Sequence, residues 1–456
     1  MIDKQISDVL KKAEKLHFVG VGGISMSSIA VFAKHRGYEV SGSDRAESEM
    51  TKRLEDSGIK VYHTHAASNA QGADAVVYTA AVTRENPEIA YAEDNGIPLI
   101  SRAEFLGYIM TGYKNRIGVS GTHGKSTTSS MLTHVFLYAG KDPTVALGAE
   151  LDELNGAYRI GAKDDFIYES CEYKDSFLSF YPDIAVILNV DHDHVDYFLT
   201  MEQMEKSFAK SVESAHTVVC RAGDEHIERA LSSFNGKIIR YGLERGLDYR
   251  ADNLVYDKGR GEFDIVNKER TLCHVKLRVP GEHNVLDSLA AAAVCDVCGI
   301  HAEDIGEALS TFTGAKRRFE FRGKMNGADV FDDYAHHPSE IRATLSGAKR
   351  LGYRKIFCIF QPHTYSRTAE LFDEFAHSFD NADVTVFADI YSAREVNTFG
   401  ISSADLAQAV EGGLYFDSNE KIVEYIRENA GENDIILVMG AGDINKISET
   451  LIGEKE

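Results

Sequence analysis

The segment from Gly118 to Thr128 reads G-V-S-G-T-H-G-K-S-T-T and combines residue types that bind phosphate. It follows the β-prone run 115–120 and precedes an apolar-periodic run, so its context is strand, loop, helix. Backbone N–H groups of such a loop can cradle phosphate oxygens at a helix N-terminus. Lys125 would add a point charge for the β- and γ-phosphates, and the Ser126 hydroxyl can reach Mg²⁺. Val119 stands where the strict pattern has its first glycine, so we interpret the segment as a variant phosphate loop rather than a glycine-rich turn with a solvated lysine.

A second glycine motif lies near the start of the chain, where Gly20-Val-Gly-Gly-Ile-Ser25 follows an apolar run and opens a helical pattern. This context fits a diphosphate-binding fingerprint, although Ser25 replaces the third glycine. Asp44 follows the next expected strand, at the distance where an acidic residue usually meets a ribose. The alternative is a purely structural βα turn. Two such loops in one chain suggest two nucleotides, or one nucleotide and a nucleotide-linked substrate.

Acidic residues and histidines follow two further expected strands. These segments are Glu169-Ser-Cys-Glu172 and Asn189-Val-Asp-His-Asp-His-Val-Asp196. Because the carboxyl ends of parallel strands meet at one sheet edge, both segments can lie beside the phosphate loop and hold Mg²⁺ against phosphate oxygens. The alternative is a polar loop with aspartates that cap helices.

Two more polar segments come directly after strands in the last third of the chain. They read Phe331-Asp-Asp-Tyr-Ala-His-His-Pro338 and Phe360-Gln-Pro-His-Thr-Tyr-Ser-Arg367. Histidines at a strand end can bind a substrate or move a proton, and Arg367 is suited to two-pronged capture of a carboxylate. Either segment alone could be a capped loop, but together they indicate a third site.

Strands must position these segments at the edges of sheets. The hydrophobic pattern predicts such strands in three α/β blocks. The first block has a strand near 15–19, a helix from about 26 to 36, and strands at 39–41, 75–78 and 97–100. The second has strands at 115–120, 165–168 and 183–188, then short β-biased segments over 236–282 that suggest an antiparallel insertion or edge, and then a helix. The third has strands at 328–331, 355–360, 384–387 and 434–439.

Composition limits the classes of protein that fit. The 456 residues carry a formal charge of −22, which argues against nucleic acid or an anionic membrane as a partner. No signal peptide opens the chain and no apolar run approaches a membrane span, so we expect a cytoplasmic protein. The six cysteines lack zinc-ligand spacing, and Cys295 and Cys298 are interpreted as small buried thiols of one helix rather than a redox pair.

Six motifs occur in an order that resembles one family. They are G-T-H-G-K-S, D-H-x-D at 193–196, P-G-x-H-N at 280–284, R-R-F at 317–319, D-D-Y-A-H-H-P at 332–338 and Q-P-H-x-Y-S-R-T at 361–368. Together they resemble the Mur ligase family from about Leu16 to about Asp443. The resemblance implies a Rossmann-like N-terminal domain (1–111) for UDP-N-acetylmuramate, a central P-loop ATPase-like parallel-sheet domain (112–321) for ATP, and a Rossmann-like C-terminal domain (322–456) for the amino acid.

The last two motifs resemble those of the members that add L-alanine. The implied reaction joins L-alanine to the lactyl carboxylate of UDP-N-acetylmuramate, the first cytoplasmic amino-acid addition of peptidoglycan synthesis. ATP and Mg²⁺ are the implied cofactors. The carboxylate would attack the γ-phosphate to give an acyl phosphate, because a carboxylate is a poor acylating agent until its oxygen becomes a good leaving group. The amine of alanine would then attack the carbonyl.

The resemblance carries roles onto individual residues. Those implied to act in catalysis are Lys125, His336, Arg318 and Asp333. Those implied for ATP are Gly121, Thr122, His123, Gly124, Lys125, Ser126, Thr127, His283, Asn284 and Asp287. Those implied for UDP-N-acetylmuramate are Gly20, Gly22, Gly23, Ser25, Asp44 and Arg102. Those implied for the amino acid are Tyr334, His336, His363 and Arg367, and those for the metal are Ser126, Glu172 and His194. His336 either accepts the proton of the amine or only orients the substrate.

Some residues depart from the family pattern. Ser25 and Ser28 replace glycines, Asp287 replaces an asparagine near the adenine, and Thr364 stands where many members have arginine, so recognition of the substrate carboxylate would rest more on Arg367. Thr364 keeps open a related ligase that adds a peptide to UDP-N-acetylmuramate. From another class, the first fingerprint could mark a nicotinamide-dependent oxidoreductase, which would leave Lys125 without a role. A catalytically silent nucleotide-binding regulator is the third alternative.

Overall fold

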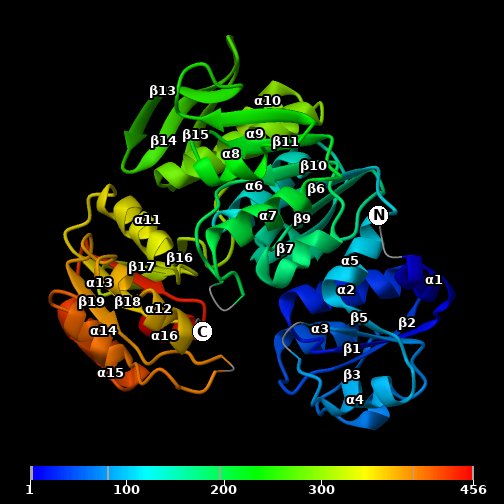
Figure 1. Ribbon diagram of the computed structural model, residues 1–456. Helices are drawn as coiled ribbons and strands as arrows, with labels where there is room; N and C mark the ends of the chain where they lie inside the picture. The colour runs from blue at the N-terminus through cyan, green and yellow to red at the C-terminus, as the bar shows by residue number, and fades with distance from the viewer. Residues whose placement is uncertain (1–3, 80–81, 195–196, 394, 454–456) are drawn as a thin grey trace. The chain divides into compact units, whose positions relative to one another are not determined.

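The computed structural model describes residues 4–79, 82–194, 197–393 and 395–453. Its strands form three α/β regions in chain order, shown from blue to red in Figure 1. The chain divides into two compact units, which are described separately. The first comprises Met1–His192 and Thr200–Arg240, and the second comprises Asp193–Leu199 and Tyr241–Glu456.

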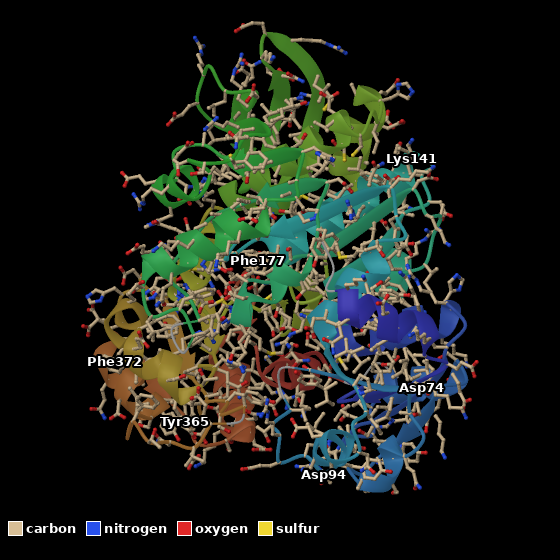
Figure 2. The ribbon with its side chains drawn as sticks, turned by 45° about the vertical axis from the view of Figure 1, so that its right-hand side comes forward. Asp74, Asp94, Lys141, Phe177, Tyr365 and Phe372 are labelled. Carbon is tan, nitrogen blue, oxygen red and sulfur yellow. The ribbon has the colours of Figure 1, made fainter. Side chains whose placement is uncertain are left out.

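The N-terminal region of the first unit is a parallel sheet with the strand order β3-β2-β1-β4-β5. Its strands are β1 (Lys15–Val19), β2 (Glu39–Ser43), β3 (Lys60–Tyr62), β4 (Ala75–Tyr78) and β5 (Leu99–Ser101). Its helices are α1 (Lys4–Lys12), α2 (Ile24–His35), α3 (Glu49–Asp56), η1 (Ala67–Ala70), α4 (Pro87–Asp94) and α5 (Arg102–Met110). Asp74, labelled in Figure 2, ties β4 to β1 by accepting the N–H groups of Glu14 and Lys15 at 2.8 Å each. The strand order reverses beside β1, which is where Rossmann-like sheets bind nucleotides.

The rest of the first unit has the strand order β12-β11-β10-β6-β9-β7-β8. The strands are β6 (Asn115–Ser120), β7 (Thr144–Leu151), β8 (Gly156–Arg159), β9 (Asp165–Glu169), β10 (Ile184–Ile187), β11 (Thr217–Arg221) and β12 (Lys237–Gly242). The helices are α6 (Lys125–Tyr138), η2 (Asp152–Leu154), η3 (Tyr173–Ser179), α7 (Met201–Ser211) and α8 (Glu225–Ala230). β6 lies between β9 and β10 and is parallel to both, so the segments after these three strands share one edge. Phe177 of η3, labelled in Figure 2, packs edge-on against Phe208 of α7 and holds η3 in place.

The second unit begins with an antiparallel ladder of β13 (Tyr249–Asp257), β14 (Arg260–Asn267) and β15 (Arg270–Pro280). Two helices of the same region follow it, α9 (Glu282–Val297) and α10 (Ala302–Thr311). α9 is rich in alanine and buried along most of its length, because small side chains let a helix lie close to a sheet.

The C-terminal region of the second unit has the strand order β16-β17-β21-β18-β19-β20. Its strands are β16 (Glu320–Met325), β17 (Ala328–Asp333), β18 (Ile356–Phe360), β19 (Val384–Phe387), β20 (Leu414–Tyr415) and β21 (Ile435–Met439). Its helices are α11 (Pro338–Lys349), α12 (Tyr365–Glu370), α13 (Phe372–Ala376), α14 (Ser403–Ala409), α15 (Asn419–Asn429) and α16 (Asn445–Ile452). Only the β16–β17 pair is antiparallel among the pairings that the described residues make in this sheet.

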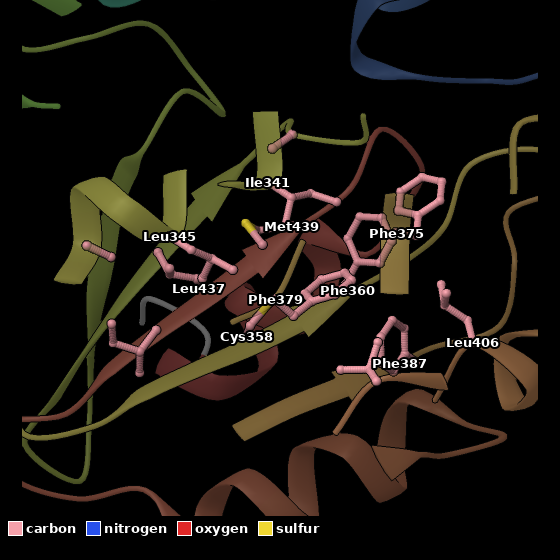
Figure 3. Packing of buried hydrophobic residues seen from close by; sticks show 14 of the residues in the cluster. Ile341, Leu345, Cys358, Phe360, Phe375, Phe379, Phe387, Leu406, Leu437 and Met439 are labelled. Atoms are coloured by element: carbon pink, nitrogen blue, oxygen red, sulfur yellow. The ribbon is translucent and has the colours of Figure 1, made fainter. Parts of the chain in front are cut away.

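Both faces of this last sheet are covered, and β21 shows why its sequence is apolar throughout. Leu437 and Met439 point into the cluster of Figure 3, which also contains Phe360 and Phe375. The intervening Val438 belongs to a second cluster on the other face. Alternate residues of a strand face opposite sides, so a strand covered on both sides reads as a continuous apolar run. This packing fixes the strand ends that carry the polar segments.

The strands and the three-block α/β organisation predicted from the hydrophobic pattern are confirmed, including the antiparallel ladder within 236–282. The pattern missed short or edge strands such as β3, β8 and β20. None of the six cysteines forms a disulfide. Cys295 is buried in α9, as expected for a structural thiol, whereas Cys298 directly follows the helix and is only partly buried, so the prediction of a buried thiol is wrong there. No helix within the described residues is long and apolar enough to cross a membrane.

Candidate functional site

The first glycine loop folds over the end of β1 and is braced by Asp44. The Asp44 carboxylate accepts the N–H of Gly22 at 2.9 Å and the N–H of Ala46 at 3.0 Å. A side chain at Gly22 would place its Cβ 2.9 Å from this carboxylate, so the close approach requires glycine. Gly20 has a φ of +81°, which also favours glycine. The predicted proximity of Asp44 and the loop is therefore present, and the carboxylate already has backbone partners.

Arg102, at the start of α5, connects this loop to the central sheet of the same unit. Its guanidinium donates to the Ser25 hydroxyl at 2.7 Å. Burial lowers the pKa of Arg102, while the nearby Cys171 and Glu169 act in the opposite direction. Two residues predicted for the sugar nucleotide, Ser25 and Arg102, are thus in contact, and the arginine lies close to the segment after β9.

The phosphate loop connects β6 to α6 and is held by the segment that follows β10. The Asn189 side chain accepts the N–H of His123 at 2.8 Å and donates to the carbonyl of the same residue at 3.0 Å. The Thr122 hydroxyl donates to the Asp191 carbonyl at 3.1 Å. Gly124 adopts the left-handed conformation at φ +84° immediately before α6, so the loop can turn tightly into the helix. The loop is rigidly supported, as binding of phosphate by backbone N–H groups requires.

Lys125 and Glu172 form a buried ion pair at this loop. The Lys125 ammonium lies 3.1 Å and 3.3 Å from the two carboxylate oxygens and also donates to the carbonyls of Gly121 and Thr122. Burial opposes the charge of the ammonium, but Glu172 together with Cys171 and Glu169 outweighs it and raises the pKa of Lys125. The lysine therefore keeps its positive charge in the buried site, where a phosphate would need it.

The predicted metal ligands divide between the two units. Ser126, buried at the start of α6, and Glu172, fully buried, belong to the first unit, and His194 belongs to the second. Among the described residues, no three His, Cys, Asp or Glu side chains are grouped to hold a metal. Mg²⁺ needs no such cage, because it retains waters and is usually bound by one or two carboxylates together with substrate phosphates. The hydroxyl and carboxylate oxygens of Ser126 and Glu172 are donors of the type that it prefers.

The residues predicted for the adenine side open α9. Asn284 is buried, and its amide donates to the Pro280 carbonyl at 2.6 Å, closing the turn from β15 into the helix. His283 is exposed and accepts from the same amide at 3.1 Å. Asp287 is buried one turn further along α9. The structure thus brings His283, Asn284 and Asp287 together. The amide of Asn284 already makes hydrogen bonds within the protein, to Pro280 and His283.

The R-R-F segment precedes β16 in a strained conformation. Arg317 and Phe319 are both left-handed, with φ values of +57° and +51°, and flank Arg318. Asp333 accepts the N–H of Phe319 at 2.8 Å, and burial raises its pKa to about 6 against the effect of Arg318. The Tyr334 ring receives both guanidiniums, with the Cζ atoms of Arg317 and Arg318 at 5.1 Å and 5.0 Å from its centroid. Asp333 and Tyr334 thus position the predicted arginine.

The four residues predicted for the amino acid form one contiguous cluster at the carboxyl edge of β17 and β18. The rings of Tyr334 and His336 lie 5.4 Å apart, and those of His336 and His363 lie 5.9 Å apart. Arg367 donates to the Nδ1 atom of His363 at 3.2 Å. Burial lowers the pKa of His336 to about 3 and that of His363 to about 4, so both imidazoles are neutral at physiological pH. We refer to Tyr334, His336, His363 and Arg367 as the amino-acid pocket.

The tautomer of His336 follows from its hydrogen bond. The Nδ1 atom of His336 lies 3.0 Å from the Tyr334 carbonyl, which can only accept, so Nδ1 carries the hydrogen. Nε2 of the neutral ring is then the proton acceptor. This arrangement suits a ring that orients the amine, whereas the lowered pKa makes His336 a weak acceptor for its proton.

Three residues of this region were not assigned to the pocket from the sequence. Asp193 lies 3.3 Å from the Arg367 guanidinium through its Oδ1 atom, and both side chains are largely buried. Tyr391 stacks on His363 with 5.6 Å between the ring centroids, and Glu395 accepts the N–H of Ser366 at 2.9 Å. Burial disfavours the charge of Asp193, but Arg367 holds the pKa of its carboxyl well below the usual range. The sequence pattern predicts Asp193 only as part of the acidic cluster 189–196. Asp196 of that cluster lies outside the described residues.

Three family models cover most of the chain. They are described as "Mur ligase family, catalytic domain" over residues 15–114, "Mur ligase middle domain" over 119–295 and "Mur ligase, glutamate ligase domain" over 317–442. Their order matches the three α/β regions of the chain. The chain therefore belongs to the Mur ligase family.

Within the family, the chain is similar to curated proteins named UDP-N-acetylmuramate–L-alanine ligase. The protein of Clostridium botulinum (strain Langeland) is 46% identical over 98% of this chain and 99% of its own length. That of Clostridium novyi (strain NT) is 44% identical over 97% and 98%. The crystal structure of the UDP-N-acetylmuramate-alanine ligase MurC of Thermotoga maritima matches with a TM-score of 0.83 at 30% identity, covering 96% of this chain and 98% of that one. A murein peptide ligase of Psychrobacter arcticus matches with a TM-score of 0.71 at 25% identity over the same shares.

Proposed function

We propose that this chain is an ATP-dependent ligase that joins L-alanine to the lactyl carboxylate of UDP-N-acetylmuramate and releases ADP and phosphate. The observation that carries the proposal is the amino-acid pocket. An arginine fork beside two neutral histidines suits a small amino acid whose carboxylate must be bound and whose amine must lose a proton. Similarity at 46% identity to ligases of that name supports the same substrates.

The first step is phosphoryl transfer to the lactyl carboxylate. The carboxylate oxygen attacks the γ-phosphorus and ADP leaves, which gives an acyl phosphate. Two anions must meet, so Lys125, held in the cationic form by Glu172, would neutralise charge on the phosphates. Ser126 and Glu172 would hold one Mg²⁺ and His194 would help to hold a second, and this metal would add charge neutralisation when bound. Arg318 would contact phosphate, and Asp333 would position that arginine.

The second step is attack by the alanine amine on the acyl carbonyl. Arg367 and His363 would bind the carboxylate of alanine, and Tyr334 and His336 would line the side of the amine. The Nε2 lone pair of His336 can accept a hydrogen from the amine, because its Nδ1 atom is committed to the Tyr334 carbonyl. The tetrahedral intermediate then expels phosphate and leaves the amide bond.

The sugar nucleotide and the adenine would bind at the remaining predicted positions. We assign UDP-N-acetylmuramate to the first glycine loop with Ser25, Asp44 and Arg102, within domain 1–111. ATP would bind at the phosphate loop and at His283, Asn284 and Asp287, within domain 112–321, and the amino acid within domain 322–456. Six cysteines that form no disulfide suit a reducing compartment, and we infer that the reaction takes place in the cytoplasm.

A ligase that adds a peptide is the second candidate, and Thr364 is the observation that favours it. The test is phosphate release by the purified chain with Mg²⁺-ATP and UDP-N-acetylmuramate, comparing L-alanine, glycine, L-serine and a tripeptide. We expect release that depends on the sugar nucleotide and is fastest with L-alanine. Preference for the tripeptide would favour the peptide ligase, and release without UDP-N-acetylmuramate would contradict both. NAD should not bind.

A further inference from the structure

Asp193 stands out in the amino-acid pocket because it carries a negative charge where a negatively charged group of the substrate is expected. Its Oδ1 atom lies 3.3 Å from the Arg367 Nη2 atom and accepts the N–H of His194 at 2.6 Å. Only 7% of the Asp193 side chain and 11% of the Arg367 side chain are exposed. Such a pair is costly to build, because both charges lose their hydration.

We propose that Asp193 binds the α-ammonium group of the amino-acid substrate while Arg367 binds its carboxylate. The inference rests on the proposed function. A free amino acid is a zwitterion, and its ammonium and carboxylate are attached to the same carbon. An arginine and an aspartate held side by side offer the complementary pair of charges, so the substrate and the ion pair can exchange partners and leave no charge unpaired in a dry site.

This arrangement selects for a free α-amino acid over a peptide. In a peptide, the α-ammonium belongs to the first residue and the terminal carboxylate to the last, so one molecule cannot place both groups on adjacent side chains. A peptide would leave either Arg367 or Asp193 without its partner, and an unpaired buried charge is strongly unfavourable. The Asp193–Arg367 pair thus provides specificity that Thr364 alone does not explain.

The opposing role for Asp193 is that of an internal counter-ion that occupies Arg367 and must be displaced. The two roles predict opposite effects of removing the charge. If Asp193 binds the ammonium, Asp193→Asn weakens binding of alanine. If it only competes with the substrate carboxylate, the same change strengthens binding.

The experiment measures phosphate release at saturating Mg²⁺-ATP and UDP-N-acetylmuramate, with L-alanine varied and with propionate, which is alanine without its amino group, as a competitive inhibitor. For Asp193→Asn we expect the KM for L-alanine to rise roughly 10- to 100-fold, as for loss of a charged hydrogen bond. The inhibition constant of propionate should fall rather than rise, because propionate on Arg367 leaves the Asp193 carboxylate unpaired in the unaltered chain and the variant removes that charge. An unchanged or lower KM for alanine, or equal losses for both ligands, would overturn the proposal.

Two further variants separate binding from folding. Asp434→Asn removes a fully buried aspartate from another ion pair, with Arg354 at 2.6 Å, at the opposite end of β21, and should leave the KM for alanine unchanged. Asp193→Glu keeps a carboxylate, so its KM should lie nearer to that of the unaltered chain; a loss as large as that of Asp193→Asn would contradict the proposal. If the unaltered chain releases no phosphate with L-alanine, the proposed function fails, whereas normal release with an unaffected Asp193→Asn variant removes only this inference.

Discussion

The phosphate loop and the amino-acid pocket each contain a buried ion pair, and the pairs differ in what surrounds them. Lys125 faces Glu172 and the carbonyl oxygens of Gly121 and Thr122, and all of these groups are acceptors. Arg367 faces Asp193 on one side and the neutral imidazole of His363 on the other. The Lys125 ammonium presents its positive charge at one point, whereas the Arg367 guanidinium spreads its charge over a planar fork.

The difference matches the ligands that each site is proposed to take. An ammonium is a compact charge that suits several phosphate oxygens, whereas a guanidinium suits the two oxygens of one carboxylate. In both sites the acidic partner occupies the position of a future ligand group. Binding would then be an exchange of ion pairs, which avoids leaving a charge without a partner in a dry site.

The largest expected effect comes from breaking the pair at the phosphate loop. Lys125→Met should lower kcat about 10³-fold, the scale of losing a preorganised group that stabilises charge in the transition state. The measurement is phosphate release with all three substrates present. Lys114→Met, which removes an exposed lysine paired with Asp164, should keep the activity. A loss of less than ten-fold in Lys125→Met would show that this pair is structural.

The amino-acid pocket should respond to removal of an uncharged group, unlike the phosphate loop. His336→Ala should lower kcat about 10²-fold, the scale of a misplaced reacting group, because the Nε2 lone pair that orients the amine is gone. ATP binding, measured by calorimetry, should change less than about two-fold, because no substrate phosphate is assigned to this ring. Equal losses in turnover and ATP binding would contradict the assignment of His336 to the amino acid.

A charge-preserving change tests whether the shape of the guanidinium matters. Arg367→Lys keeps the charge but loses the fork, so we expect the KM for L-alanine to rise about ten-fold with little change in the KM for ATP. Arg354→Lys is the matched control, because Arg354 also pairs with a buried aspartate of the same sheet. A small effect in both variants would mean that charge alone suffices, and the contrast with Lys125 would then be lost.

The sequence predicted these sites because parallel strands deliver their following residues to one edge. The polar segments after β6, β9, β17 and β18 were recognisable as short motifs at the ends of apolar runs. Tyr334, His336, His363 and Arg367 were expected together, and the structure places them in contact.

The contribution of Asp193 could not be predicted in the same way. It is separated from Arg367 by 174 positions, and its motif is equally compatible with capping or metal binding. Tyr391 and Glu395 follow β19 with no motif around them, and their contacts depend on the fold of one loop. Spacing along a strand or helix is a local property, whereas partners contributed by separate loops are set by tertiary packing.

The smallest expected effect concerns Asp332, a buried carboxylate beside Arg317. It tests how the distance between carboxylate and guanidinium affects the pKa of the acid. The Oδ2 atom of Asp332 lies 3.6 Å from Nε of Arg317, beyond good hydrogen-bond geometry, and only 1% of its side chain is exposed. Burial raises the pKa of Asp332 to about 7 despite this arginine, in contrast with Asp193. Between about pH 4 and pH 7, Asp332 is then protonated in the folded chain but ionised in the unfolded chain. Its contribution to stability therefore falls as the pH rises through that window. Asp332→Asn should remove this decline in the free energy of unfolding. In the unaltered chain we expect the decline to amount to about 2 kcal/mol between pH 5 and pH 8.

Thermal unfolding of both chains at pH 5 and pH 8 measures this effect, because the two curves should converge at pH 5 and separate at pH 8 in favour of Asp332→Asn. Asp405→Asn is the control. Hydrogen bonds from Ser402 lower the pKa of Asp405, so its carboxyl is ionised at both pH values and its loss should shift stability equally at each. A parallel shift in Asp332→Asn as well would mean that Arg317 keeps Asp332 ionised at 3.6 Å, and the distinction drawn between Asp332 and the closely paired Asp193 would fail.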